Sequence, residues 1–444
     1  MKTLSTRRGR RRLLVPSTLA LSAFFGCNPS SALDVTDPDV LNVADYASPA
    51  GANPLRFGVI QDFTVAFSAT QDGAIVHGGN LADEIYSTDT FDDRLFPNQR
   101  TTTEVLGALD GFYRNLHRAR AGASRTIPIL REFAPTPAAN IGEIYAIRGY
   151  SELFFSEMFC SGVPFSDENT PGDALTTTQM FDRALASFDS ALTLAGTDAK
   201  VRPLAQIGRA RTLLNLNRPA DAAAAVAGVT TNYKYETFHS QASGRQENGV
   251  WNAISVSAPR YAMYIPAEAR VQFLRTPADP RVPWAASTRV GFNSAHVNLP
   301  NQLKYGRAGA VSLADGIEAR LIELEARLRG GAPADRQAVF DGLNSLRSSG
   351  GIANIPQLTT VPATQDAAVD LLFEERALWM WLTGHRLGDL RRLIRQYGRG
   401  AETVFPTGAL RAPLAGNYGT DVNLIIPAAE RNNAKFGGCI NRGA

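Results

Sequence analysis

Apolar residues recur every three or four positions over most of the chain, which is the period of an amphipathic α-helix. This pattern predicts helices over the following ranges: 55–69, 103–119, 141–159, 178–195, 202–216, 220–229, 313–328 and 336–346. Short turns containing Gly, Asp or Pro separate neighbouring helices, and alanines such as Ala210 and Ala223 would let the backbones approach closely. The pattern is typical of degenerate tetratricopeptide-like repeats, in which each helix pair buries its face on the next.

Residues 232–307 interrupt this helical pattern. The segment is rich in Gly, Pro, Asn and Ser, and it shows only weak alternation of apolar and polar residues, at 250–256 and 260–265. We expect an insertion of short strands and long loops on the helical frame. Residues 71–98 are rich in Gly, Asp and Thr and are predicted to be a loop. The expected fold class is therefore mostly α, with a loop-rich insertion that carries short strands.

The segment 367–397 is predicted to form two antiparallel helices that turn at Thr383-Gly384. The first helix is apolar on nearly all sides, as expected of a helix inside an array. Charged residues nevertheless occur in its middle and after the turn: Glu375, Arg376, Arg386, Asp389 and Arg392. Because an unpaired ion near a core is costly, we expect Glu375 and Asp389 to meet arginines across the turn. The alternative is an ordinary hairpin with a solvated charged edge.

The first 27 residues have the layout of a lipoprotein signal peptide. A basic run at 7–12 precedes an apolar stretch at 13–25, too short to span a bilayer, and Gly26-Cys27 follows it as in a bacterial lipobox. Cys27 is therefore the expected lipid attachment site, and two or three acyl chains would hold the protein on a membrane. Residues 28–54 are read as a tether and 55–444 as a single domain. A secreted protein without lipid is the alternative.

Charge and cysteine content narrow the class of protein further. The formal net charge is +3, but the six basic residues before position 13 account for it, and without them it is −3. A mildly acidic body gives no electrostatic reason to expect nucleic-acid binding. If Cys27 carries lipid, Cys160 and Cys439 remain, an even number in an oxidising compartment. A disulfide between them is one hypothesis, and two unrelated thiols are the other.

Motifs along most of the chain resemble, in order, the SusD/RagB family of outer-membrane nutrient-binding lipoproteins. The C-terminal signature of that family is matched in the charged hairpin, although Trp379 and Thr383 stand where acids are usual. The matching segments are Glu375-Arg376, Gly384-His385-Arg386 and Asp389-Leu390-Arg391-Arg392. Weaker matches occur at Arg148-Gly149, Val163-Pro164, Asp279-Pro280-Arg281, Leu343-Asn344 and Ile426-Pro427. Arg281 is read as a structural partner of Asp279.

The resemblance implies a function as well as a fold. A member of this family is a surface-exposed lipoprotein, anchored in the outer membrane, that acts as the lid of a TonB-dependent SusC-like channel. It presents captured glycan or oligosaccharide, or sometimes peptide, to that channel. It is not an enzyme and needs no cofactor. These properties are expectations for this chain.

Aromatic and amide side chains supply candidates for a ligand site. Sugar rings stack on aromatic faces, while polar side chains hydrogen-bond to the hydroxyl groups. The insertion and the predicted 71–98 loop provide the following candidates: Trp251, Tyr261, Tyr264, Trp284, Tyr86, Phe96 and Asn98. If the family resemblance holds, some of them form a shallow platform at the face that meets the transporter. The alternative for each aromatic residue is packing of the insertion onto the helices.

Common catalytic motifs are absent from the sequence. It contains no Gly-rich phosphate loop, His-Glu-x-x-His, Cys-x-x-Cys or Gly-x-Ser-x-Gly. The five histidines are far apart, so no metal site is expected. Two other functions stay open. One is a periplasm-facing helical-repeat scaffold that binds proteins, and the other is a glycoside hydrolase using acids such as Asp83-Glu84 or Asp92-Asp93.

Overall fold

The computed structural model describes residues 46–444 except 168–169 and 264–269. The signal peptide, Cys27, residues 28–45 of the tether and Tyr264 lie outside the described residues. The described residues form these α-helices: α1 (Ala52–Phe67), α2 (Ala74–Leu81), α3 (Asp92–Asn98), α4 (Gly107–Phe133), α5 (Ala138–Met158), α6 (Thr177–Ala195), α7 (Val201–Asn215), α8 (Pro219–Val226), α9 (Gly249–Ile254), α10 (Gly316–Leu328), α11 (Pro333–Ser349), α12 (Gln365–Trp379), α13 (Arg386–Tyr397) and α14 (Ala401–Val404). The strands are β1 (Ile85–Ser87), β2 (Val163–Pro164), β3 (Ala174–Leu175), β4 (Lys234–Thr237), β5 (Tyr261–Met263), β6 (Trp284–Arg289), β7 (Leu299–Gln302) and β8 (Val311–Asp315).

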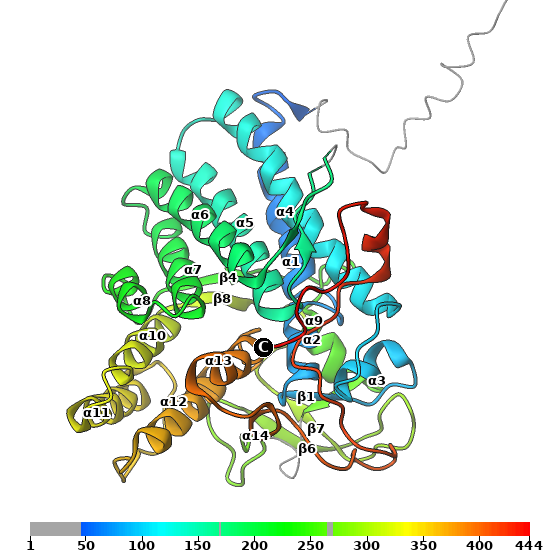
Figure 1. The fold of residues 1–444 in the computed structure, drawn as a ribbon, viewed down its shortest axis with the longest axis vertical. Coiled ribbons are helices and arrows are strands. Elements are labelled where there is room, and N and C mark those ends of the chain that lie inside the picture. Colours follow the sequence, from blue (N-terminus) through cyan, green and yellow to red (C-terminus); the bar gives the residue numbers. More distant parts are fainter. Residues whose placement is uncertain (1–45, 168–169, 264–269) are drawn as a thin grey trace, which may run out of the picture. The chain divides into compact units, whose positions relative to one another are not determined.

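The helices stack mainly in chain order. Helix α4 packs between α1 and α5, and α5, α6, α7 and α8 then each pack on the next (Figure 1). Helix α8 contacts α10, which in turn contacts α11 and α12. The predicted fold class, mostly α with tetratricopeptide-like stacking and short strands, is confirmed.

A single aromatic ring shows how closely these helices approach one another. Phe188 of α6 is fully buried, and it lies against Gly149 of α5 and Gly208 of α7. A Cβ atom added to Gly149 would lie 2.8 Å from the Phe188 ring, and one added to Gly208 would lie 2.3 Å from it. Both distances are shorter than van der Waals contact, so the two helices can touch this ring only where they carry no side chain.

The structure differs from the sequence prediction in three segments. The predicted loop at 71–98 contains α2, β1 and α3; α2 carries adjacent glycines that weaken its helical signal, but all eight of its residues are buried. Residues 250–256, predicted as a strand, overlap α9, whose first turn is capped because Trp251 N–H donates to Asn248 Oδ1 at 2.9 Å. Helix α1 begins at Ala52, inside the predicted tether.

The strands form four separate antiparallel pairs: β1–β5, β2–β3, β4–β8 and β6–β7. The strand predicted at 260–265 is confirmed over Tyr261–Met263. Its pairing with β1 places Ser87 opposite Tyr261 and Tyr86 opposite Ala262. This pair joins the 71–98 segment to the insertion, which lies about 170 residues later in the chain. Figure 1 shows β1 and the pair β6–β7 together, apart from the stack of α4 to α8.

The α12–α13 hairpin holds its charged residues in the interior, so the solvated-edge alternative is wrong. Arg376 donates two hydrogen bonds to Asp389 across the turn, both at 3.1 Å, and Arg392 lies 2.9 Å from the same carboxylate. Burial alone would raise the pKa of Asp389, but these two guanidinium groups hold that pKa well below its usual range. The prediction that Asp389 meets an arginine across the turn is therefore confirmed.

The prediction that Glu375 meets an arginine across the turn is wrong. Its partners lie on other elements. Its carboxylate accepts hydrogen bonds from Arg281 of the insertion, at 2.7 Å, and from Arg347 of α11. Arg281 also lies 2.8 Å from Asp279. Neighbouring residues in a helix point about 100° apart, so Glu375 and Arg376 face different surroundings.

Two further arginines of the hairpin pair with acids from distant elements. Arg386 donates to Asp83, at 2.5 and 2.8 Å, and Arg392 donates to Glu325 at 2.9 Å. All four side chains are buried. The arginines of this hairpin are thus paired with an acid from α10 and an acid that follows α2. The hairpin itself has Trp379 and Thr383, which carry no charge, where acids are usual in the family that it resembles.

The C-terminal tail is tied to the end of α5. Cys160 and Cys439 form a disulfide, with an S–S distance of 2.00 Å and Cα atoms 5.8 Å apart. Beside it, Ile440 N–H donates to the Ser161 carbonyl at 2.7 Å, and Cys160 N–H donates to the Leu424 carbonyl at 2.8 Å.

Across residues 46–444, outside the two gaps, no helix combines the length and apolar character needed to cross a bilayer.

Candidate ligand-binding sites

Three of the predicted ligand-binding residues lie in the interior, so their assignment to an exposed platform is wrong. Tyr86 and Tyr261 are 2% and 0% exposed, because the β1–β5 pair that carries them is covered on both faces. The Tyr261 hydroxyl donates to Asp72 at 3.2 Å. Asn98 is buried and accepts a hydrogen bond from Ser87 N–H at 3.1 Å, which fixes the end of α3 against β1.

The other described candidates are partly accessible and stay predictions. Trp251 of α9 is half-buried, with the Arg307 guanidinium 5.6 Å from its ring centre. Trp284 of β6 and Phe96 of α3 are half-buried and pack against the core. Tyr264 lies outside the described residues.

The structure brings together two exposed aromatic rings that the sequence did not single out. Phe91 immediately precedes α3, and Phe292 lies in the loop between β6 and β7; the side chains are 54% and 39% exposed. Their ring centres are 6.4 Å apart. The guanidinium of Arg260, next to β5, lies 4.0 Å from the Phe292 ring centre and 5.6 Å from that of Phe91. We call Phe91, Arg260 and Phe292 the aromatic cluster.

A buried carboxylate fixes one side of the aromatic cluster. Asp89 is 1% exposed, and Arg260 donates to it at 2.7 Å. The same carboxylate accepts hydrogen bonds from Arg94 at 3.3 Å and from Phe91 N–H at 3.2 Å. One acid therefore positions both the arginine and the backbone of an exposed ring, so this part of the surface is pre-organised.

Backbone hydrogen bonds fix the other side of the cluster. Phe292 N–H donates to the Pro259 carbonyl, and Asn293 N–H donates to the Thr88 carbonyl, both at 2.9 Å. A Cβ atom on Gly291 would lie 2.7 Å from the Thr88 Cβ, so the loop can lie this close only with glycine there. Since the loop is attached to β1 and β5, the Phe292 ring is held at a defined position.

The cluster has the chemical groups that sugar recognition needs. Two phenyl rings offer apolar faces, and the guanidinium between them carries N–H donors beyond the one that binds Asp89. The residue types alone gave no signal for this site, because Phe91, Arg260 and Phe292 come from three segments that meet only through the β1–β5 pairing. The sequence identified the two contributing regions, the 71–98 segment and the insertion, but not the exposed residues within them.

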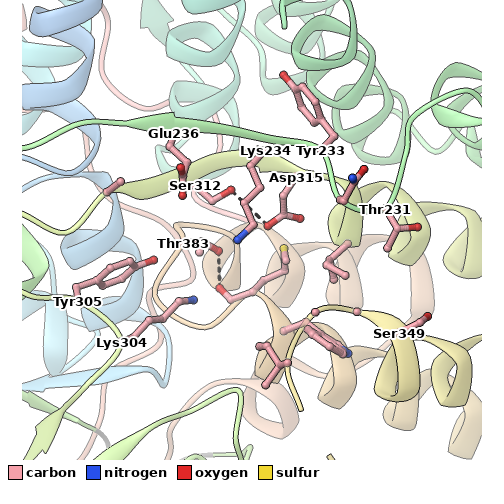
Figure 2. Close-up of a pocket in the computed structure, with 18 residues that line it drawn as sticks. Thr231, Tyr233, Lys234, Glu236, Lys304, Tyr305, Ser312, Asp315, Ser349 and Thr383 are labelled. Atoms are coloured by element: carbon pink, nitrogen blue, oxygen red, sulfur yellow. Dashed lines mark hydrogen bonds between the residues drawn. The ribbon is translucent and has the colours of Figure 1, made fainter. Parts of the chain in front are cut away.

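A pocket of about 570 Å³ forms a second candidate site, between the β4–β8 pair, the end of α11 and the α12–α13 turn (Figure 2). Its lining includes these polar side chains: Lys234, Glu236, Lys304, Ser312, Asp315 and Thr383. Lys304 donates a hydrogen bond to the Trp381 carbonyl in the turn. Burial lowers the pKa of Lys304 to about 8.

Asp315, one of the two acids in the lining of this pocket, makes local hydrogen bonds. Asp315 caps α10, since it accepts from Glu318 N–H at 2.8 Å, and its other oxygen accepts from the Ser312 hydroxyl at 3.3 Å. Burial raises the pKa of Asp315. Both of its carboxyl oxygens are therefore engaged within the fold.

Three of the four acids considered for glycoside hydrolysis have structural roles, and the fourth, Asp92, is exposed. Asp83 pairs with Arg386, and Glu84 accepts a hydrogen bond from Leu382 N–H at 2.9 Å. Both are buried, and burial raises the pKa of Glu84 to about 8. Asp93 accepts a hydrogen bond from Gly107 N–H, at 2.7 Å, at the start of α4. In the described part of the chain, no group of three or more His, Cys, Asp or Glu side chains is placed to hold a metal ion.

Comparisons by sequence and by structure give different results. No family model matches the sequence. The search of curated proteins finds no related sequence either. Many solved structures, in contrast, are similar in fold, and the three described next match over nearly their whole length.

Three solved structures illustrate the similarity. A SusD superfamily protein from Bacteroides vulgatus matches with a TM-score of 0.63 and 14% identity, over 89% of this chain and 99% of its own. A SusD-like carbohydrate binding protein from Bacteroides fragilis matches with a TM-score of 0.63 and 12% identity, over 87% and 98%. A laminarin-binding SusD-like protein gives 0.62 and 12%, over 88% and 98%. The resemblance predicted from the sequence motifs is thus confirmed at the level of the fold.

Proposed function

We propose that this protein, which has the SusD fold, is a surface-exposed outer-membrane lipoprotein that binds nutrient glycan or oligosaccharide and delivers it to a TonB-dependent SusC-like transporter. It acts by binding alone, without catalysis. The observation that carries this proposal is the fold itself, shared with SusD-like chains over 87–89% of this chain in the three examples. Two of those chains are named for carbohydrate or laminarin binding.

The aromatic cluster is the proposed glycan surface. A pyranose ring can lie against the exposed faces of Phe91 and Phe292, while the Arg260 guanidinium donates to its hydroxyl groups. Because Asp89 and the Pro259 carbonyl already hold these groups in place, binding needs little ordering of side chains. A pre-organised, shallow surface suits a protein that captures a glycan and then releases it to a partner.

The proposed membrane anchor is a lipid on Cys27. The basic and apolar run before Gly26-Cys27 supports this assignment. The Cys160–Cys439 disulfide is in keeping with a protein that folds in an oxidising compartment. The delivery partner, a SusC-like transporter, is inferred from the shared fold.

The glycan site is tested by calorimetry with laminari-oligosaccharides and a panel of other neutral oligosaccharides. Replacing Phe292 by Ala removes one exposed ring, and we expect about three- to tenfold weaker binding. The matched control is Phe57→Ala. Phe57 is also exposed, and its ring lies 5.1 Å from the Arg56 guanidinium, but it is on α1. Equal affinity in the wild type and Phe292→Ala would remove the aromatic cluster as the glycan site.

Location and partner are tested in cells. The wild type should be cleaved by protease added to intact cells and should co-purify with a large β-barrel transporter. A Cys27→Ser variant should be released from the membrane fraction while keeping its fold. Protection of the wild type from external protease, together with the absence of glycan binding, would instead favour the periplasmic protein-binding scaffold.

A further inference from the structure

We propose that the pocket between β4, β8 and the α12–α13 turn binds a carboxylate-bearing sugar residue, a uronate unit of an acidic saccharide. This site is separate from the aromatic cluster. The inference deepens the proposed glycan-binding function by naming a second site and its ligand class, and it rests on that function only in taking the ligand to be a saccharide.

The distribution of lysine in the chain gives the first argument. The protein has five lysines, and its remaining basic residues are arginines. Among the four described lysines, Lys200 and Lys435 pair with carboxylates, each at 2.9 Å. The other two, Lys234 and Lys304, both line the pocket, and within the described residues neither has a carboxylate oxygen within ion-pair distance.

The two lysines reach the same space from different elements. Lys234 extends from β4, and Lys304 comes from the segment after β7; Figure 2 shows both ammonium groups directed toward the middle of the pocket. Lys304 uses one proton for the Trp381 carbonyl and keeps two donors. Two converging ammonium groups with spare donors form a binding site for a carboxylate.

The remaining lining fits a sugar better than a bare anion. The lining also includes the apolar side chains of Ile317, Ile352 and Met380, which can cover the apolar face of a pyranose. Glu236 also lines the pocket and makes no side-chain hydrogen bond to another described residue, so its carboxylate is available to accept from a sugar hydroxyl. A volume of about 570 Å³ lies within the range of small-ligand sites.

The electrostatics around Lys304 support this assignment. The charged groups that act on it are Asp315 of β8, Glu84 of the segment between α2 and β1, and Lys234 of β4. Burial lowers the pKa of Lys304 to about 8 despite the two acids, so its ammonium is poorly compensated. A bound carboxylate would favour the charged form of Lys304. Because Lys304 loses its proton as the pH rises past about 8, binding of the carboxylate should weaken there.

The test is calorimetry on the mature protein with digalacturonate, using the neutral galactose disaccharide of the same linkage as the matched ligand. We expect digalacturonate to bind more tightly than the neutral disaccharide, and Lys234→Gln to weaken it about tenfold or more. Lys435→Gln makes the same change of charge at an exposed site and should leave the affinity unchanged. Added salt should weaken binding to the wild type.

Further variants separate this proposal from the proposed function. Phe292→Ala should weaken laminari-oligosaccharide binding and spare digalacturonate binding, whereas Lys234→Gln and Lys304→Gln should do the reverse. Equal affinity for digalacturonate in the wild type and both lysine variants would overturn the pocket assignment while leaving the aromatic cluster untouched. Tighter binding of a sulfated disaccharide than of digalacturonate would overturn the choice of a uronate.

Discussion

The α12–α13 hairpin and the aromatic cluster use the same pair of chemical groups for different purposes. In the hairpin, Arg376 and Asp389 are both about 1% exposed, and every neighbour is protein. In the cluster, Asp89 is equally buried, but the Arg260 side chain is 25% exposed and lies between two accessible rings. Burying only the acid fixes an arginine without removing it from solvent. The first arrangement holds the fold together, and the second presents a defined surface.

Breaking the buried pair should give the largest effect. Asp389→Asn leaves Arg376 and Arg392 without their shared carboxylate in the interior, and we expect a loss of about 3–5 kcal/mol in the free energy of unfolding. Urea denaturation of the purified protein measures this loss.

An exposed pair provides the control for this comparison. Asp173 pairs with Lys435 at 2.9 Å, with its side chain 79% exposed. Asp173→Asn should change the free energy of unfolding by less than about 0.5 kcal/mol. If Asp389→Asn were as mild as Asp173→Asn, the hairpin charges would not hold the fold together.

The next largest effect is a dependence of folding stability on pH that is caused by Glu84. Its pKa in the folded state is about 8, above the ordinary value of 4.5. Between those pH values the folded protein keeps a proton that the unfolded chain has lost. The stability that Glu84 contributes is therefore complete below pH 4.5 and falls as the pH rises to 8, by a total on the order of 4 kcal/mol.

Glu84→Gln should remove this dependence on pH. Glutamine keeps an oxygen that can accept from Leu382 N–H, and it resembles the protonated acid. The variant should match the wild type in urea denaturation at pH 5 and be more stable than it at pH 8. A constant difference between the two proteins across this range would show that Glu84 does not hold a proton in the folded state.

The smallest effects are expected from replacing an arginine by lysine, once in the hairpin and once in the aromatic cluster. Arg376→Lys gives up one of two hydrogen bonds in a buried site and should cost about 1–2 kcal/mol of unfolding free energy. Arg260→Lys keeps the charge near Asp89 but loses the planar group between the rings. It should leave stability within about 0.5 kcal/mol and weaken laminari-oligosaccharide binding about threefold. Circular dichroism melting and calorimetry measure the two quantities.

Local patterns in the sequence were sufficient to predict the helical stack and that Asp389 meets an arginine across the turn. The partners of Glu375 and Arg386 could not be predicted, because Arg281 and Asp83 lie about 90 and 300 positions away and meet them only in the folded chain. The same limit applies to the site. Tyr86 looked like a ligand-binding residue because of its type, but strand pairing buries it, and exposure is a tertiary property.

Helix α2 and the residues of the aromatic cluster also depend on tertiary structure that the local sequence does not show. The adjacent glycines in α2 weaken its helical propensity, and burial of the whole helix compensates. Phe91 and Phe292 carry no local sign of exposure, since phenylalanine is most often buried. Regular elements follow from periodicity, whereas the choice of exposed rings depends on which loops the β1–β5 pair brings together.

The Asp89–Arg260 contact joins segments 171 residues apart, and this has a practical consequence. A chain that has folded its helical stack but not docked its insertion would lack the complete sugar-facing surface. Affinity for a glycan would therefore report on whether the insertion has docked, and a bound oligosaccharide would protect both segments from hydrogen exchange at once.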